Sequence, residues 1–317
     1  MNRAHRTRPG WPEPVFILSP PRSYSTVTTA LLAGHPEVFG LPEMLTFSAP
    51  TIGDLLSGIG CLCVLSAEPH EPEACPFLAV RLSGPYRAIA ELHEGGQHDA
   101  AIRRAGKWLR ENADWPGERL LDHLLGLLAP RIGLEKSPDT VRSDKNLARC
   151  ISGYPGARYI HLTRHPVTAQ RSLQQHLALG NRSASPRRLA AQAATIWFQA
   201  HLRITRALGQ LPPEQSFRVR GEDLLRSPQT WLPRILGWLG LEAGPDTVAT
   251  MLRTERWPFA GTGTSGRLFG GDHKFMLSPE LSPVPEPGPL EFEPAWGLLD
   301  EMCARMSRLA NHLGYPA

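Results

Sequence analysis

The sequence has no long apolar run, and this excludes an obvious membrane-spanning segment. No window of the 317-residue chain approaches the roughly 20 apolar residues that a membrane helix needs. The first 14 residues are rich in Arg and Pro and hold no apolar stretch of signal-peptide length. We therefore expect a cytoplasmic protein without a membrane partner, in which residues 1–13 form a disordered basic tail and residues 14–317 a single domain.

Cysteine is scarce and irregularly spaced, which argues against a disulfide framework. The five cysteines are Cys61, Cys63, Cys75, Cys150 and Cys303. The Cys61-x-Cys63 pair is one residue shorter than the usual zinc-binding pair, and no second pair follows it. We expect reduced, structural cysteines and no metal ion.

A strong excess of either charge is also missing. The chain has 34 basic and 30 acidic residues, a net charge of +4, which is too small to indicate a nucleic-acid partner. This mild positive bias suits an anionic ligand. The abundance of Ala, Arg, Pro and Gly is typical of a GC-rich bacterial genome.

Apolar runs alternate with helical patterns, and this alternation predicts an α/β fold with a mainly parallel sheet flanked by helices, a three-layer arrangement similar to P-loop proteins. Strands are predicted at 15–18, 132–135, 158–163 and 216–220, and helices at 27–33, 101–112, 120–128, 189–208, 229–240 and 295–313, with one more after Pro166. Residues 45–130 are predicted to form a mostly helical insertion on the substrate side. Residues 256–294, rich in Pro and Gly, are predicted to be a loop that covers a cofactor or substrate.

The segment from Ser19 to Thr26 joins the first predicted strand to the first helix. A helix N-terminus has unpaired N–H groups and partial positive charge, so such a junction binds anions. Arg22, Ser25 and Thr26 add a cation and two hydroxyls there. The segment lacks the Gly-x-x-x-x-Gly-Lys-Ser/Thr pattern of nucleotide-triphosphate loops. It therefore predicts a site for a phosphate or sulfate group rather than a Walker-type site.

A second junction carries the same kinds of side chain. Arg164 ends the strand at 158–163, and Ser172 lies eight residues further on, a little over two helical turns, so both can face the same side. Ligands bind beyond the carboxyl ends of parallel strands. We expect the two junctions to hold two phosphate groups of one nucleotide.

Five segments in order resemble the sulfotransferases that use 3′-phosphoadenosine 5′-phosphosulfate (PAPS). They are Pro21-Arg22-Ser23-Tyr24-Ser25-Thr26, His35-Pro36-Glu37-Val38 leading to Glu43, Glu135-Lys136-Ser137-Pro138, the run from Ile160 to Pro166 with Ser172, and the run from Arg218 to Leu224. The resemblance covers roughly residues 14–275. It is most similar to bacterial sulfotransferases of the polyketide and olefin-synthase type, which sulfate a hydroxyl on a carrier-bound acyl chain.

The resemblance implies the residues that bind the cofactor. The 5′-phosphosulfate would lie on a loop comprising Arg22, Ser23, Tyr24, Ser25, Thr26 and Val27. The 3′-phosphate would contact Arg164 and Ser172, with Arg267 of the late loop as a further ligand. The product would be adenosine 3′,5′-bisphosphate (PAP), and the reaction would need no metal.

Sulfuryl transfer needs a base for the acceptor hydroxyl and positive charge for the leaving phosphate. Arg22 stays protonated and would act as an electrostatic clamp. Glu43 is the first candidate base, and Lys136 would orient Glu43, touch the sulfuryl group or form a structural ion pair. His273 in the late loop is a rival base. His161 is expected to be packed in the core.

Two positions depart from the family pattern. Gly221 stands where many relatives have the Tyr of Tyr-Glu-Asp, so an aromatic that could contact adenine is missing. Tyr24 replaces a usual glycine, and its side chain must tolerate the dihedral angles of the loop or project toward the acceptor. How adenine is held stays open.

Two other functions remain open from the sequence. One is a magnesium-dependent, nucleotide kinase-like phosphotransferase, and the other is a non-catalytic nucleotide-binding protein. The acceptor is expected to be a small-molecule natural product or an acyl or polyketide chain, either free or tethered to a carrier protein. The oligomeric state is left open.

Overall fold

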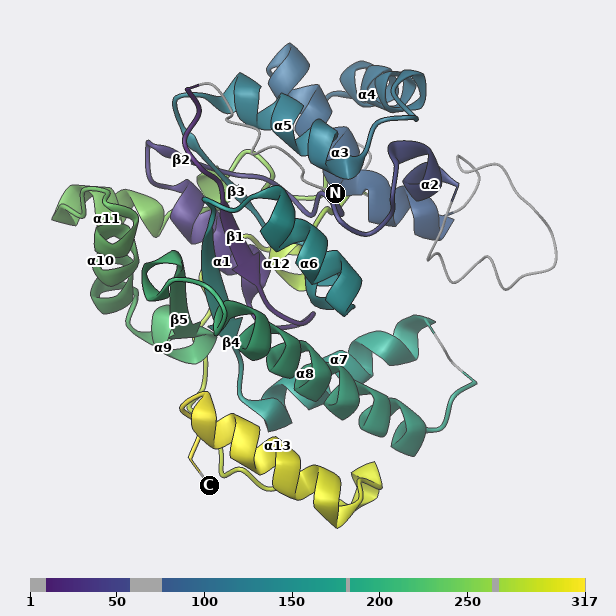
Figure 1. The fold of residues 1–317 in the computed structure, drawn as a ribbon, viewed down its shortest axis with the longest axis vertical. Coiled ribbons are helices and arrows are strands. Elements are labelled where there is room, and N and C mark those ends of the chain that lie inside the picture. Colours follow the sequence, from purple (N-terminus) through teal and green to yellow (C-terminus); the bar gives the residue numbers. More distant parts are fainter. Residues whose placement is uncertain (1–9, 58–75, 181–182, 264–267, 317) are drawn as a thin grey trace.

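One parallel sheet organises the protein (Figure 1). The structure, a computed structural model, describes residues 10–57, 76–180, 183–263 and 268–316. Within these residues the strand order is β2-β3-β1-β4-β5, and every strand pair is parallel. The strands are β1 (Val15–Leu18), β2 (Val38–Gly40), β3 (Ile132–Glu135), β4 (Arg158–Thr163) and β5 (Ser216–Arg220). The α/β fold and four of these strands were predicted from the sequence and are confirmed.

Strand β2 was missed. Only three residues long, it is too short for a recognisable apolar pattern. It forms one edge of the sheet by pairing with β3. Its place next to β3 brings the segment that follows it, which contains Glu43, to the carboxyl edge of the sheet.

Side chains of β1 alternate between two buried clusters on the two faces of the sheet. Phe16 and Leu18 pack into a cluster with helices α3 (Pro76–Glu94), α4 (Asp99–Glu111) and α5 (Gly117–Leu128). Val15 and Ile17 pack into a cluster with α10 (Pro228–Leu239) and α11 (Pro245–Met251). All four are buried. A strand covered on both faces reads as a continuous apolar run, and this explains why β1 was visible in the sequence.

Helices cover both faces and one end of the sheet (Figure 1). They are α1 (Ser25–Ala33), α2 (Ile52–Leu56), α3 (Pro76–Glu94), α4 (Asp99–Glu111), α5 (Gly117–Leu128), α6 (Asp144–Gly153), α7 (Pro166–Gly180), α8 (Pro186–Leu208), α9 (Gly221–Arg226), α10 (Pro228–Leu239), α11 (Pro245–Met251), α12 (His273–Leu277) and α13 (Asp300–His312). Helices α2 to α5 lie within residues 45–130, which were predicted to be mostly helical. The described helices include none with the length and apolar character needed to cross a membrane.

The described part of the region 256–294 has little regular structure, as predicted, apart from the five-residue helix α12. Helix α13 begins at Asp300 rather than at 295, because Gly297, with φ of 64°, ends a short 3₁₀ turn that precedes it. Helix α1 begins two residues earlier than predicted, at Ser25. These differences lie at element boundaries, where local patterns are weakest.

Several candidate side chains are structural, as expected. His161 is buried on β4, where its Nε2 lies 2.9 Å from Nδ1 of His201. Trp197 is buried in the cluster that joins α7, α8 and α13. Cys150 and Cys303 are free thiols, and the other three cysteines lie outside the described residues.

Candidate active site

The loop between β1 and α1 has an unusual backbone. Arg22 and Tyr24 both have left-handed conformations, with φ of 66° and 64°. Residues other than glycine rarely adopt this conformation. Alternating left- and right-handed conformations turn successive N–H groups toward one side. Here the loop curls around the start of α1 and lines a cavity of about 580 Å³.

This loop has the features of an anion site. Among the described residues no side chain caps the N-terminus of α1 with a hydrogen bond. The hydroxyl of Ser23 is buried and finds no hydrogen-bond partner in the part of the chain that the structure describes. Orphaned donors of this kind, beside the positive end of a helix dipole, suit a phosphate or sulfate oxygen. Ser25, Thr26 and Val27 line the same cavity.

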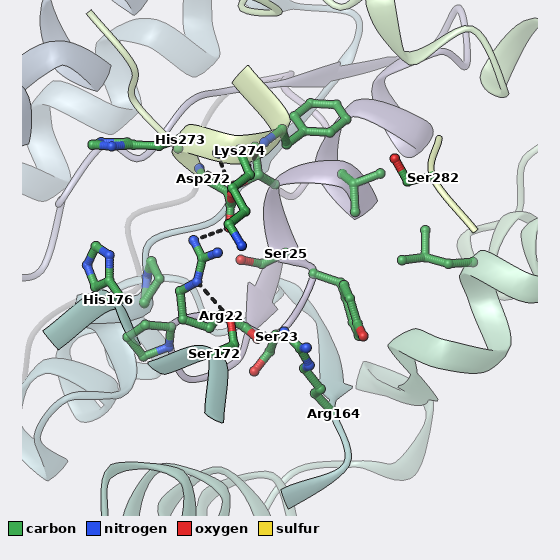
Figure 2. Close-up of a pocket in the computed structure, with 18 of the residues that line it drawn as sticks. Arg22, Ser23, Ser25, Arg164, Ser172, His176, Asp272, His273, Lys274 and Ser282 are labelled. Atoms are coloured by element: carbon green, nitrogen blue, oxygen red, sulfur yellow. Dashed lines mark hydrogen bonds and ion pairs between the residues drawn. The ribbon is translucent and has the colours of Figure 1, made fainter. Parts of the chain in front are cut away.

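The second junction, between β4 and α7, meets the first. The Nη1 of Arg164 donates to the carbonyl oxygen of Arg22 at 2.7 Å, and the Nε of Arg22 donates to Ser172 Oγ at 3.2 Å. Figure 2 shows Arg22, Arg164 and Ser172 converging on one pocket. The two arginine-bearing strand ends therefore open into one cavity, as the sequence predicted.

Buried contacts fix this second junction. Glu222, at the start of α9, accepts from the backbone N–H of His165 at 2.9 Å and from the hydroxyl of Tyr315, also at 2.9 Å. The indole N–H of Trp197 donates to the carbonyl oxygen of Arg164 at 2.9 Å. Glu222 therefore fixes the backbone at the end of β4, next to Arg164.

Glu43 and Lys136 form an ion pair at the edge of the cavity. Lys136 Nζ lies 2.6 Å from Glu43 Oε1 and donates to Thr26 Oγ1 at 3.0 Å. The Lys136 side chain is 1% exposed and that of Glu43 28%. Oε1 is thus the Glu43 oxygen that is hydrogen-bonded to Lys136. This ion pair is what either an orienting role or a structural role of Lys136 would require.

The neighbours of Lys136 hold the backbone beside Glu43. Met44 N–H donates to Glu135 Oε1 at 3.3 Å, and Leu45 N–H donates to Ser137 Oγ at 2.9 Å. Burial raises the pKa of Glu135 to about 7. Glu135, Lys136 and Ser137 thus act together as a support for residues 43–45.

Asp272 comes from the late covering loop and was not singled out from the sequence. Its carboxylate forms an ion pair with the Arg22 guanidinium, and its N–H donates to Thr26 Oγ1 at 2.9 Å. The same carboxylate caps α12 by accepting from the N–H of Lys274 and Phe275. A carboxylate thus contacts the cation predicted to bind an anion (Figure 2).

Arg87 anchors the covering loop and was also missed. This buried side chain of α3 donates through Nη1 to the carbonyl oxygens of Gly261, Leu268 and Phe269 at 2.8 to 3.1 Å. Burial lowers the pKa of Arg87 to about 10, so it remains charged at neutral pH. The helical insertion and the loop are therefore joined at a fixed point.

Two histidines lie to one side of Arg22, opposite Ser282 (Figure 2). His273 stacks on Phe269 with ring centroids 3.9 Å apart. His176 lies on α7, one turn beyond Ser172, and was not predicted as a site residue. Burial lowers the pKa of both rings, and the Arg22 charge adds to the effect. Both histidines and Glu43 line the cavity that holds the arginines.

Two predictions about this site have separate outcomes. Arg267 lies outside the described residues. Tyr24 does not stand free in the cavity, because its ring packs against the Arg164 guanidinium, 4.3 Å from the ring centroid, and against Gly221. The described residues include no cluster of three or more His, Cys, Asp or Glu side chains that could hold a metal ion.

Comparisons with known proteins agree with the fold and the motifs. The protein-family model described as "Sulfotransferase family" matches residues 14–245. The sulfotransferase domain of the olefin synthase from Synechococcus PCC 7002 is 25% identical with a TM-score of 0.68, covering 96% of this chain and 95% of that one. The sulfotransferase domain from the curacin biosynthetic pathway is 23% identical with a TM-score of 0.68, covering 96% and 98%. No curated protein sequence matches.

Proposed function

The chain belongs to the sulfotransferase family, and from this premise we propose that it transfers a sulfuryl group from PAPS to a hydroxyl of a natural-product or acyl-chain acceptor. The observation that carries the donor assignment is the shared cavity of the two junctions. Arg22 and Arg164 lie one hydrogen bond apart, beside an uncapped helix N-terminus and an orphaned buried hydroxyl. Such a site suits a ligand with more than one anionic group.

The residues divide between the two anionic ends of the donor. Arg22, Ser23, Ser25, Thr26 and the first N–H groups of α1 would hold the 5′-phosphosulfate, with Tyr24 and Val27 completing the loop. Arg164 and Ser172 would hold the 3′-phosphate, together with Arg267 if the resemblance extends to it. When bound, PAPS would supply the sulfuryl group and PAP would leave.

Glu43 is the proposed general base. Lys136 holds its Oε1, so Oε2 is the oxygen available to the acceptor hydroxyl. The proton of the acceptor hydroxyl would pass to this carboxylate. The hydroxyl oxygen of the acceptor would form a bond to sulfur while the bond from sulfur to the phosphate oxygen breaks. Arg22 would balance the charge that builds on the leaving phosphate. His273 is the alternative base, since its lowered pKa leaves it neutral at pH 7.

The acceptor proposal rests on a similar protein and on the cavity. One similar structure belongs to an olefin synthase, and this favours an acyl chain made by a biosynthetic enzyme. Leu45, Pro138 and Phe269 give the wall near Glu43 an apolar character that suits such a chain. We propose a small-molecule or carrier-tethered hydroxyl acceptor, and neither nucleic acid nor membrane as partner.

Thermal unfolding with PAP tests the donor assignment. A ligand at 100 times its Kd stabilises the native state by about 2.7 kcal/mol, which raises Tm by several degrees. Adenosine 5′-monophosphate, which lacks the 3′-phosphate, should give a much smaller shift at the same concentration. A shift with ATP and Mg²⁺ but none with saturating PAP would favour the kinase-like alternative and overturn the proposal.

A further inference from the structure

The Tyr24 ring fills the space that a side chain at position 221 would need. A Cβ atom built on Gly221 would lie 2.6 Å from Cδ2 of Tyr24, 3.4 Å from its Cβ and 3.2 Å from the carbonyl oxygen of Thr163. Real Cβ atoms essentially never come within 3.0 Å of another heavy atom. Gly221 is the first residue of α9, and its backbone is not left-handed. The Tyr24 ring, together with the Thr163 carbonyl oxygen, therefore leaves room for nothing larger than glycine at position 221.

Position 24 itself favours glycine. Its φ of 64° is a conformation that bulky residues rarely adopt, and glycine would adopt it without strain. The chain nevertheless places a large aromatic ring there. The two departures from the family pattern, an added ring at position 24 and a missing ring at position 221, thus meet at one place in the structure.

The ring stands at a boundary within the cavity. On one side it lies over the Arg164 guanidinium, 4.3 Å from the ring centroid. The same cavity is also lined by Leu225 of α9 and by residues 278–285 of the covering loop, which are apolar at Leu281, Pro283, Val284 and Pro285 and polar at Ser278, Glu280 and Ser282. Since the arginines would hold the phosphates, this mixed apolar and polar lining is the part of the cavity that suits a base.

We infer that Tyr24 provides the aromatic contact for the nucleotide base, and that Gly221 is its matched partner because it leaves room for the ring. This inference rests on the proposed function. A base–aromatic contact changes affinity by about 10- to 100-fold when the ring is removed. It depends on the π-face of the ring rather than on the tyrosine hydroxyl.

A double-mutant cycle on the full chain tests the pairing. The variants are Tyr24→Gly, Gly221→Tyr and the double variant, each titrated with PAP by calorimetry, with the unliganded Tm measured alongside. Tyr24→Gly should weaken PAP binding about 10- to 100-fold, and Gly221→Tyr at least as much, because two rings cannot share the space. The double variant should recover most of the lost affinity, since the ring returns from the other side.

Two further measurements separate the base contact from a general effect. Tyr24→Phe keeps the ring and should bind PAP far better than Tyr24→Gly. Inorganic pyrophosphate has no base, so it should bind Tyr24→Gly and the unmodified protein with similar affinity, measured by its competition with PAP. If pyrophosphate and PAP weaken equally in Tyr24→Gly, Tyr24 acts only through Arg164 and the inference is wrong.

The outcomes also separate this inference from the proposed function. If the unmodified protein does not bind PAP, the donor assignment itself fails. If it binds PAP but the losses of the two single variants simply add in the double variant, only the pairing of Tyr24 with Gly221 fails. If Gly221→Tyr does not fold, the comparison of Tyr24→Gly with Tyr24→Phe still decides the role of the ring.

Discussion

At one end of the cavity, Arg22 and Arg164 emerge from two adjacent strand ends, whereas at the other end Glu43 follows β2 and pairs with Lys136, which follows β3. The first end is fixed by short backbone contacts, such as the 2.7 Å bond from Arg164 to the Arg22 carbonyl. The second depends on contacts between segments distant in the sequence, such as the 2.6 Å pair of Lys136 and Glu43. We call them the anion end and the acceptor end.

This difference in construction matches a difference in the tasks proposed for the two ends. An anion can be held by a pre-formed loop and helix terminus, which need no reorganisation. A base must meet an acceptor that varies between enzymes, so its supports come from loops and insertions, which carry most functional variation. Changes at the acceptor end should therefore reduce turnover, and changes at the anion end should reduce affinity.

Glu43→Gln should give the largest effect, a loss of turnover with little loss of PAP affinity. If turnover and affinity fell together, the distinction between the two ends would be wrong. Loss of a general base lowers kcat about 10²- to 10⁴-fold. PAP affinity should stay within about twofold, because Glu43 contacts Lys136 rather than either arginine. Turnover is measured as PAP release with a 3-hydroxyacyl pantetheine thioester as trial acceptor. Glu37→Gln, an exposed carboxylate after α1, is the matched control. Normal turnover in Glu43→Gln would point to His273 as base.

Arg164→Ala tests the opposite end. Hydrogen bonds to charged groups contribute about 1.5–3 kcal/mol, so PAP affinity should fall about 10- to 100-fold. The kcat at saturating PAPS should fall less, because Arg164 lies away from Glu43. Arg171→Ala, on the helix α7 that follows Arg164, is the control, since Arg171 is exposed and pairs with Glu293. Equal losses in both variants would mean that Arg164 acts only through general charge.

The sequence predicted the anion end well, for a physical reason. The buried strand β1 is a continuous apolar run, and β4 mixes apolar and polar residues, so both strands could be located to the residue. The parallel arrangement then places their carboxyl ends side by side, which brings Arg22 and Arg164 together. Local sequence and one topological rule were sufficient.

The acceptor end was predicted only where a motif marked it. Glu43 and Lys136 were found through the family resemblance, but Asp272, His176 and Arg87 were not, because their roles depend on packing between distant segments. Tyr24 and Gly221 were each noticed as departures from the family pattern. Only the structure shows that they contact one another.

Asp272→Asn would sharpen the comparison, because Asp272 belongs to the covering loop but contacts the anion end. Its carboxylate competes with an anionic ligand for Arg22, so the neutral variant should bind PAP more tightly, by about three- to tenfold at low salt. Asparagine can still cap α12. Glu280→Gln, another carboxylate of the cavity lining, is the control and should show a smaller change. Weaker binding in Asp272→Asn would show instead that Asp272 positions Arg22.

Glu135→Gln should change stability rather than turnover or affinity, and it tests whether pH acts on the support of the acceptor end. The folded-state pKa of Glu135, about 7, lies above its value of 4.5 in the unfolded chain. The unfolded chain therefore releases this proton at lower pH than the folded protein does. The stability associated with the protonated carboxyl is fully present below pH 4.5 and is lost as the pH rises through 7. Glutamine stays neutral and avoids this loss, so Glu135→Gln should gain stability relative to the unmodified protein between pH 5 and pH 8, by up to about 3 kcal/mol.

Denaturant unfolding at several pH values measures the difference, with Glu37→Gln as the control. A difference that does not change with pH would show that Glu135 is ionised throughout. In that case Met44 N–H donates to a permanent carboxylate, and the support of residues 43–45 does not depend on pH in this range.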